Sequence, residues 1–177
     1  MFRIGILGAA DIAFNRFLPA LEKIQGVQCA GVASNSPDKL RRFVDKYNIH
    51  VYESYDEVIQ DENVDCIYVP LPPVFHYEWA KKALLAGKHV FLEKPSTISA
   101  EQTRELVGLA GSMGLVLQEN YMFQYHAQLA DIEKIIASGE LGKLRLVRTS
   151  FGFPRRAGGD FRYVKELGGG TMLDNGG

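Results

Sequence analysis

Short apolar runs alternate with longer amphipathic stretches over the first 118 residues of the chain. Short runs bounded by Gly or Pro are typical of buried strands, whereas apolar residues at i, i+3, i+4 and i+7 indicate helices. The runs at 4–7, 27–33, 65–69 and 90–92 are predicted strands, and 115–117 is predicted as the sixth strand of the series. This alternation predicts an α/β fold with a doubly wound parallel sheet of the Rossmann type.

The predicted helices carry recognisable start signals. The first opens near Ile12, and Pro19 within it removes a backbone donor, so we expect a kinked or two-part helix. Ser36 followed by Pro37 is typical of a helix start, and Ser54–Glu57 has the pattern of a capping box.

The pattern changes after residue 120. Apolar residues at helical spacing between 129 and 136 predict a helix that ends at Ser138–Gly139. Alternation from Lys143 to Phe153 predicts a strand, which would be an exposed edge prone to association. Residues 154–170 are rich in glycine and charge and predict a long loop.

Composition excludes several classes of function. The chain has 177 residues and a formal net charge of −1 without a basic block, which disfavours nucleic-acid binding. No apolar run approaches the roughly 18 to 20 residues of a membrane span, and the start lacks a signal-peptide pattern. We therefore expect a soluble cytoplasmic protein that does not bind a membrane. Cys29 and Cys66 are predicted to be buried free thiols, and the histidines lack the paired spacing of a zinc site.

The turn after the first strand has the layout of a dinucleotide-binding turn. Gly8, Ala10 and Ala13 occupy the three glycine positions of G-x-G-x-x-G, although alanine at the second position departs from the strict pattern. Small residues there let the backbone approach a pyrophosphate, and the helix start offers N–H groups to it. The predicted cofactor contacts in this turn are Gly8, Ala10, Asp11 and Ile12.

The end of the second predicted strand bears on the choice of cofactor. It lies about 20 residues after the glycine turn, where an acidic residue usually binds the ribose of NAD. Here the chain has Ser34–Asn35–Ser36 without a carboxylate, and Lys39, Arg41 and Arg42 follow. Hydroxyls and cations suit a 2′-phosphate, so Ser34, Asn35, Ser36 and Lys39 are predicted contacts and NADP is favoured over NAD. The alternative is that the basic residues form an ordinary solvated helix face.

Two further strand ends carry candidate chemistry. Glu93–Lys94–Pro95 follows a buried strand, and ligands of open α/β sheets bind at the carboxyl ends of strands. A lysine there can move a proton or polarise an oxygen, and a solvated Glu–Lys pair is the alternative. Leu71 and Pro72 begin a stiff apolar turn suited to lie along a nucleotide, and His76 follows just inside the next helix.

Four stretches together resemble the Gfo/Idh/MocA family of nicotinamide-dependent oxidoreductases and occur in the family's order. They are Phe2–Ala13, Pro70–His76, Glu93–Lys94–Pro95 and Gly168–Gly176. The resemblance implies a Rossmann-type NAD(P)-binding domain over residues 1–120. It also implies that 121–177 is the start of a C-terminal α+β domain for substrate binding and oligomerisation.

The resemblance also implies an activity. It indicates a dehydrogenase or reductase that transfers a hydride between nicotinamide, as NADP or NAD, and a sugar, sugar nucleotide or cyclic polyol. A non-catalytic dinucleotide-binding regulator or sensor is the alternative, and retention of Lys94 and Asp174 favours the enzyme. Members of the family are considerably longer than this chain. We therefore expect the isolated 177 residues to bind cofactor weakly without turnover, and the full-length protein to be a homo-oligomer.

Individual roles follow from the family's motifs. By this resemblance Lys94 polarises the reacting oxygen or relays its proton, Glu93 binds the nicotinamide ribose, and Asp174 orients the substrate or the acid–base residue. That acid–base residue would come directly after Gly177, and a simple turn former is the alternative for Asp174. His76 is implied to contact cofactor or substrate, and a helix-start hydrogen bond is its alternative.

The junction after residue 120 also resembles the family, but less closely. The family often has arginine near Gln124 and proline near Ala127, and this chain has neither. His126 is either a proton donor or, as we favour, a structural residue.

Overall fold

The structure, a computed structural model, describes residues 1–152, 154–156 and 158–175. The chain divides into two compact units. The first contains residues 1–120 together with the described residues from Phe161 onward, and the second is Tyr121–Asp160. All predicted site residues lie in the first unit.

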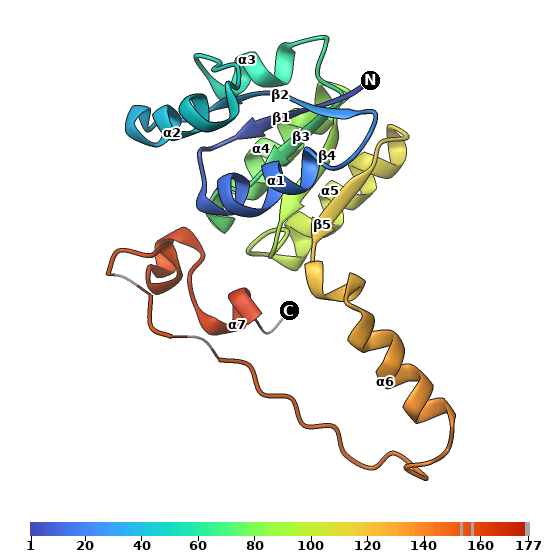
Figure 1. Cartoon of the computed structure of the whole chain (residues 1–177). Coiled ribbons are helices and arrows are strands. Elements are labelled where there is room, and N and C mark those ends of the chain that lie inside the picture. Colours follow the sequence, from blue (N-terminus) through green and yellow to red (C-terminus); the bar gives the residue numbers. More distant parts are fainter. Residues whose placement is uncertain (153, 157, 176–177) are drawn as a thin grey trace. The chain divides into compact units, whose positions relative to one another are not determined.

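The first unit is built on one parallel sheet with the strand order β2–β1–β3–β4–β5, shown in Figure 1. The strands are β1 (Phe2–Leu7), β2 (Val27–Ala33), β3 (Cys66–Val69), β4 (His89–Glu93) and β5 (Leu117–Asn120). Val51 adds a single parallel bridge to Val32 beyond β2. That bridge takes the place of the third strand in the 3-2-1-4-5-6 order of a Rossmann fold. The predicted doubly wound sheet is therefore confirmed.

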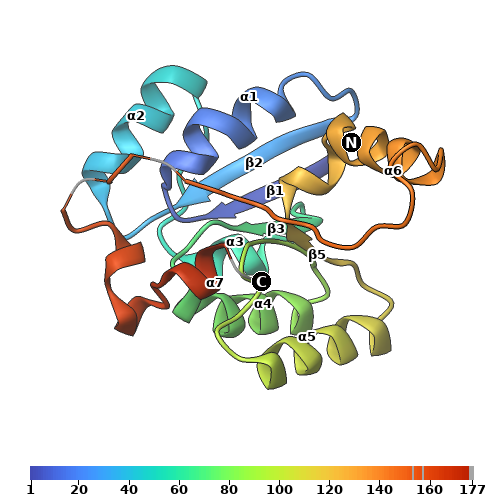
Figure 2. The same cartoon turned by 90° about the horizontal axis from the view of Figure 1, so that it is seen from below.

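Helices cover both faces of this sheet. The helical elements of the unit are η1 (Ala13–Phe17), α1 (Leu18–Leu21), α2 (Pro37–Tyr47), α3 (Tyr55–Gln60), η2 (Pro73–Phe75), α4 (His76–Leu85), α5 (Ala100–Ser112), η4 (Phe161–Tyr163), η5 (Lys165–Leu167) and α7 (Thr171–Asn175). Figure 2 shows α1 and α2 on one side of the sheet and α4 and α5 on the other. Each face has its own hydrophobic cluster, centred on Phe43 of α2 and on Leu84 and Leu106 of α4 and α5.

Most helix starts follow the sequence signals. The π-helical η1 passes directly into α1, which has Pro19 in its first turn, so the predicted two-part helix is confirmed. The Ser54 hydroxyl accepts a hydrogen bond from the Glu57 N–H at 3.1 Å, as its capping box predicts. α2 begins at Pro37 as predicted, but the Ser36 side chain does not cap it.

The last strand is displaced from its predicted position. β5 begins at Leu117 and ends at Asn120, not at 115–117. The Leu115 N–H donates to the Ala110 carbonyl at 2.9 Å and so still closes the end of α5. As a result the strand extends further, and Asn120 lies beside Glu93 in the ladder between β4 and β5.

The second unit, Tyr121–Asp160, contains η3 (Met122–Tyr125) and α6 (Ala127–Ala137), which is the helix predicted there. The strand predicted at Lys143–Phe153 is wrong for 143–152, where no strand forms, and Phe153 lies outside the described residues. A strand needs hydrogen bonds from a neighbouring strand, and the described part of this unit has none to supply them. The His126 Nδ1 accepts from the Gln128 N–H at 3.1 Å and caps α6, which agrees with its structural interpretation.

Cys29 in β2 and Cys66 in β3 are free thiols, as predicted, but only Cys66 is buried and Cys29 is half-buried; desolvation raises the pKa of each to about 12. Three His, Cys, Asp or Glu side chains placed to hold a metal ion do not occur among the described residues. Nor does the described part of the chain include a helix with the length and apolar character needed to cross a bilayer.

Candidate functional site

The glycine turn and the apolar turn meet at the carboxyl ends of β1 and β3. Gly8 has φ +105°, and its N–H donates to the Ala33 carbonyl at 2.7 Å. The positive φ favours glycine at this position, and a Cβ there would also lie 2.7 Å from the end of the Leu71 side chain, which would have to shift. The strand order reverses between β1 and β3, and open α/β sheets bind ligands at such a point. This cradle therefore fits a dinucleotide.

The predicted 2′-phosphate residues have different environments. The Ser34 hydroxyl accepts from the Ser36 N–H at 3.2 Å and is half-buried, whereas Lys39 and Arg41 are exposed on α2. Arg42 instead reaches across to the glycine turn, where its Nη2 lies 2.6 Å from the Asp11 carboxylate. The Arg42 side chain thus links α2, which follows β2, to the glycine turn, which follows β1.

Glu93 is fixed by two donors that sequence reasoning did not identify. Its Oε1 accepts hydrogen bonds from the Tyr68 hydroxyl at 2.6 Å and from the Asn120 amide at 2.8 Å. Tyr68 is fully buried and stacks on Phe17 at 4.1 Å between ring centroids. Burial, with the Glu93 charge, raises the pKa of Tyr68, so the phenol remains a donor. Both donors lie on strands that flank β4, and this adjacency was the signal that could have found them.

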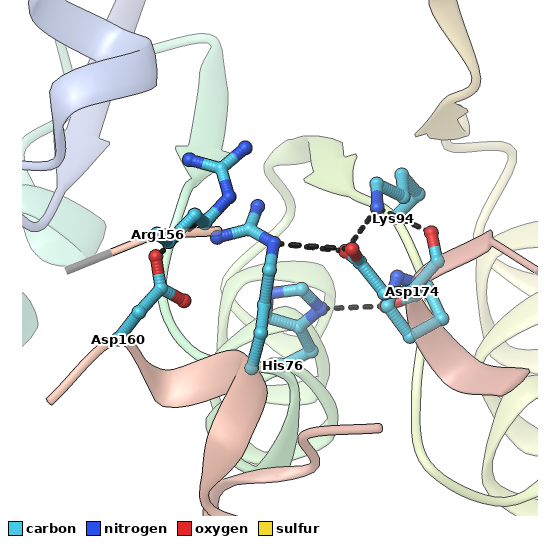
Figure 3. A network of polar contacts seen from close by, with 7 residues as sticks. His76, Lys94, Arg156, Asp160 and Asp174 are labelled. Carbon is cyan, nitrogen blue, oxygen red and sulfur yellow. Dashed lines mark hydrogen bonds and ion pairs between the residues drawn. The ribbon is translucent and has the colours of Figure 1, made fainter. Parts of the chain in front are cut away.

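Lys94 and Asp174 come together although 80 positions separate them in the sequence. The Lys94 ammonium donates to the Asp174 carboxylate and backbone carbonyl, each at 2.5 Å. Arg162 donates to the same carboxylate from its Nε, at 3.1 and 3.2 Å. Figure 3 shows Lys94 and Asp174 pointing toward one another. The solvated-pair interpretation of Lys94 therefore does not describe this structure.

The electrostatics of this cluster keep its carboxylate ionised. The side chains of Lys94, Asp174 and Arg162 are only 25%, 12% and 23% exposed. Burial opposes ionisation of Asp174, but hydrogen bonds and charge from Lys94 and Arg162 hold its pKa below the ordinary value. Arg162 was missed because nothing in the sequence separates it from the other arginines of its loop.

The glycine-rich segment carries Asp174 to the sheet. Gly168 has φ +80°, and a Cβ there would lie 2.9 Å from both Pro73 and Ile98. Only glycine therefore allows the segment to pack closely against the turns that follow β3 and β4. Those are the turns that hold Leu71 and Lys94, so the packing places the aspartate next to the lysine.

His76 lies between the turns that follow β3 and β4. Its ring is fully buried; Nδ1 lies 2.8 Å from the Pro95 carbonyl oxygen and Nε2 lies 2.7 Å from the Leu71 carbonyl oxygen. Burial lowers the pKa of His76, against the opposing effect of those carbonyls and of Glu93. The buried ring and its two carbonyl partners favour the alternative, in which His76 positions the turns. The implied contact with cofactor or substrate stays a prediction.

The remaining predicted contacts line the same edge. Ala10, Ile12, Leu71 and Pro72 are half-buried, and Asp11 is exposed. Together with the Glu93 and Lys94 clusters they lie at the carboxyl ends of the strands.

Family models match most of the chain. Residues 2–121 match a model described as an oxidoreductase family with an NAD-binding Rossmann fold. Residues 129–177 match a model described as the GFO/IDH/MocA C-terminal domain.

Individual relatives agree with these matches. The chain is 42% identical over 174 residues to dTDP-3,4-didehydro-2,6-dideoxy-alpha-D-glucose 3-reductase of Saccharopolyspora spinosa, covering 98% of this chain and 52% of that protein. It is 32% identical to D-xylose 1-dehydrogenase (NADP(+)) 2 of Haloferax volcanii, covering 97% of this chain and 53% of that protein. The chain spans about half the length of the curated relatives it matches.

A solved structure of a related enzyme has a similar fold. A 3-ketoreductase from Actinomadura kijaniata, solved in complex with NADP and TDP-benzene, superposes with a TM-score of 0.94 at 40% identity. The match covers 99% of this chain and 54% of that chain. By fold, motif order and family models, this chain belongs to the GFO/IDH/MocA family of oxidoreductases.

Proposed function

We propose that this chain forms the cofactor-binding part, and one side of the active site, of an NADP-dependent oxidoreductase that acts on a nucleotide-linked sugar. The observation that carries the proposal is the convergence of Lys94 and Asp174 at the carboxyl edge of the sheet. A sensor of the same fold would not need a lysine and a carboxylate held together beside the cofactor cradle. We therefore favour the enzyme over the regulator.

The cofactor assignment rests on the two turns at this edge. The Gly8 turn admits a dinucleotide, and Glu93 is held in place by Tyr68 and Asn120 to bind a ribose. Ser34–Asn35–Ser36 lacks a carboxylate that would repel a 2′-phosphate. NADP also appears in the names of the Haloferax relative and the Actinomadura structure.

The chemistry divides between the cofactor and the protein. The nicotinamide supplies or accepts the hydride. During ketone reduction negative charge develops on the substrate oxygen, and the Lys94 ammonium is placed to stabilise it or to relay a proton to it. Asp174 holds that ammonium in position, and Arg162 in turn holds the Asp174 carboxylate.

The substrate class is taken from the relatives. The Saccharopolyspora relative is named as a reductase of a dTDP-linked keto sugar, and the Actinomadura 3-ketoreductase was solved with TDP-benzene. We therefore propose a keto sugar carried on a nucleoside diphosphate. The division into domains at residues 120 and 121, assembly as a homo-oligomer and a cytoplasmic location remain predictions.

The test removes the ammonium and measures binding and turnover separately. NADPH binding is titrated by fluorescence on the 177-residue chain. Turnover is measured on the chain and on a fusion that continues into the second half of the Saccharopolyspora reductase. Lys94→Met is expected to lower kcat of the fusion at least about 100-fold while NADPH affinity stays within about threefold. Lys23→Met, which removes an exposed lysine, is the matched control.

Two results would overturn the proposal. One is full turnover in the Lys94→Met fusion. The other is a fusion that binds NADPH tightly but reduces none of a panel of nucleotide-linked keto sugars, because this would favour the regulator.

A further inference from the structure

The Arg42 guanidinium lies where two cofactor-binding turns meet. It belongs to α2, yet its Nη2 is 2.6 Å from the Asp11 carboxylate and 3.4 Å from the Ala9 carbonyl oxygen in the glycine turn. It therefore spans the carboxyl ends of β1 and β2. The adenosine half of a dinucleotide lies across this part of a Rossmann fold.

Two aromatic rings also pack on this guanidinium. Its central carbon lies 4.7 Å from the Phe14 ring centroid and 5.5 Å from that of Phe43, which is fully buried. Its Nε is buried and finds no acceptor among the described residues. A guanidinium has five N–H donors, and few of them are satisfied here. Because the Arg42 side chain is still 35% exposed, its outer nitrogens can be reached by a ligand.

The Asp11 carboxylate, which pairs with Arg42, is easily displaced by another anion. The Asp11 side chain is 81% exposed, and ion pairs so exposed to water contribute little to stability. A phosphate presents more negative charge and can accept two parallel hydrogen bonds from a guanidinium. Phosphate should therefore displace Asp11 from Arg42.

We propose that Asp11 and Arg42 form a cofactor-selecting pair. Arg42 binds the 2′-phosphate of NADP(H), and the Asp11 carboxylate occupies the guanidinium until that phosphate arrives. The inference rests on the proposed use of NADP(H). It goes beyond that use by assigning selectivity to a contact between α2 and the glycine turn instead of to Ser34–Asn35–Ser36 and Lys39. Asp11 then weakens NADPH binding, whereas Arg42 strengthens it.

The experiment compares NADPH and NADH affinities of the 177-residue chain by fluorescence titration. Arg42→Gln is expected to weaken NADPH binding about tenfold or more and NADH binding less than twofold. Asp11→Asn is expected to tighten NADPH binding about threefold and to leave NADH nearly unchanged, since the lost ion pair is exposed. Combined with Arg42→Gln, the Asp11→Asn change should no longer affect NADPH selectively.

Matched controls and a second probe separate binding from folding. Arg104→Gln and Asp45→Asn remove the same charges at exposed positions and should leave both affinities unchanged. Arg42→Lys keeps the charge but loses the planar fork, so an intermediate NADPH affinity is expected from a folded variant. In competition titrations, 2′,5′-ADP should lose affinity in Arg42→Gln, whereas 5′-AMP should not.

Four outcomes would overturn the pair. Equal loss of NADPH and NADH in Arg42→Gln would show that Arg42 only supports the turn. Weaker NADPH binding in Asp11→Asn would show that Asp11 is needed in the complex. Binding of neither nucleotide by the unmodified chain would overturn this inference together with the proposed cofactor. A normal NADPH preference that survives Arg42→Gln would overturn the inference alone.

Discussion

At the scale of single residues, the site depends on side chains that hold other side chains. Glu93 and Asp174 each receive at least two donors, and in both cases one of them, Tyr68 or Arg162, comes from an element that carries no motif. A carboxylate held by two donors has a fixed orientation. If the proposed function holds, a cofactor and a substrate would meet a preformed surface, and less ordering would be required on binding.

Tyr68→Phe tests this arrangement for Glu93. The ring would keep its packing on Phe17, but Glu93 would lose a hydrogen bond from a buried donor. We expect the free energy of unfolding to fall by about 2 kcal/mol, measured by urea denaturation, because hydrogen bonds to charged groups contribute about 1.5–3 kcal/mol. NADPH affinity should fall about three- to tenfold.

The control for this change is Tyr125→Phe, since Tyr125 is 75% exposed. It should alter neither stability nor affinity. If Tyr68→Phe lowered stability but left NADPH affinity intact, Tyr68 would be only a core residue and Glu93 would not need its help.

At the scale of elements, His76 joins the connection after β3 to the connection after β4. Because its pKa is lowered by burial, the folded protein binds a proton on this ring less readily than the unfolded chain does. The stability that His76 contributes is therefore complete above its ordinary pKa of 6.5 and is lost as pH falls below that value. Above 6.5 this contribution should not vary with pH.

His76→Gln should remove that pH dependence. We expect the free energy of unfolding to fall by about 1–3 kcal/mol at pH 7.5, because the Pro95 and Leu71 carbonyls lose the buried ring as their partner. We also expect a smaller loss of stability between pH 7.5 and 5.5 than in the unmodified chain. Urea denaturation at both values measures this, with His50→Gln, at an exposed position, as the control. Equal pH slopes in the two proteins would show that His76 does not titrate in this window.

Which elements could be predicted depends on where their interactions come from. β1, β3 and β4 are buried between two layers of helices, so their apolar runs are visible in the sequence. The strand predicted at 143–152 had good alternation but lacks a partner in the described part of its unit, and a pattern cannot supply one. The third strand is reduced to the bridge of Val51.

The site was predictable where motifs exist and not elsewhere. Gly8, Glu93 and Lys94 follow directly from strand ends, and Asp174 was assigned through the family resemblance. Contacts across strands or across loops leave no local signature, so Tyr68 and Arg162 emerged only from the structure. Among the basic residues of α2, sequence could not show that Arg42 pairs with the glycine turn.

At the scale of the whole molecule, the two units differ in how their apolar side chains are covered. The sheet unit buries two hydrophobic clusters. In the Tyr121–Asp160 unit, α6 leaves its four main apolar side chains exposed. They are Leu129 at 38%, Ile132 at 40%, Ile135 at 45% and Ile136 at 43%. An isolated helix of 11 residues is marginal in water, so α6 should be the less stable part of this chain.

Hydrogen exchange tests this difference within one molecule. Amides of α6 should exchange with solvent far faster than those of α5, a helix of 13 residues that buries Leu106 and Ala110. Protection of α6 equal to that of α5 would contradict the expectation and would show that its apolar face is covered. Repeating the measurement after dilution and with Ile132→Glu would then show what covers the apolar face of α6. Protection lost in both cases would mean that a second copy of the chain packs on α6, whereas protection retained on dilution would mean a contact within one chain.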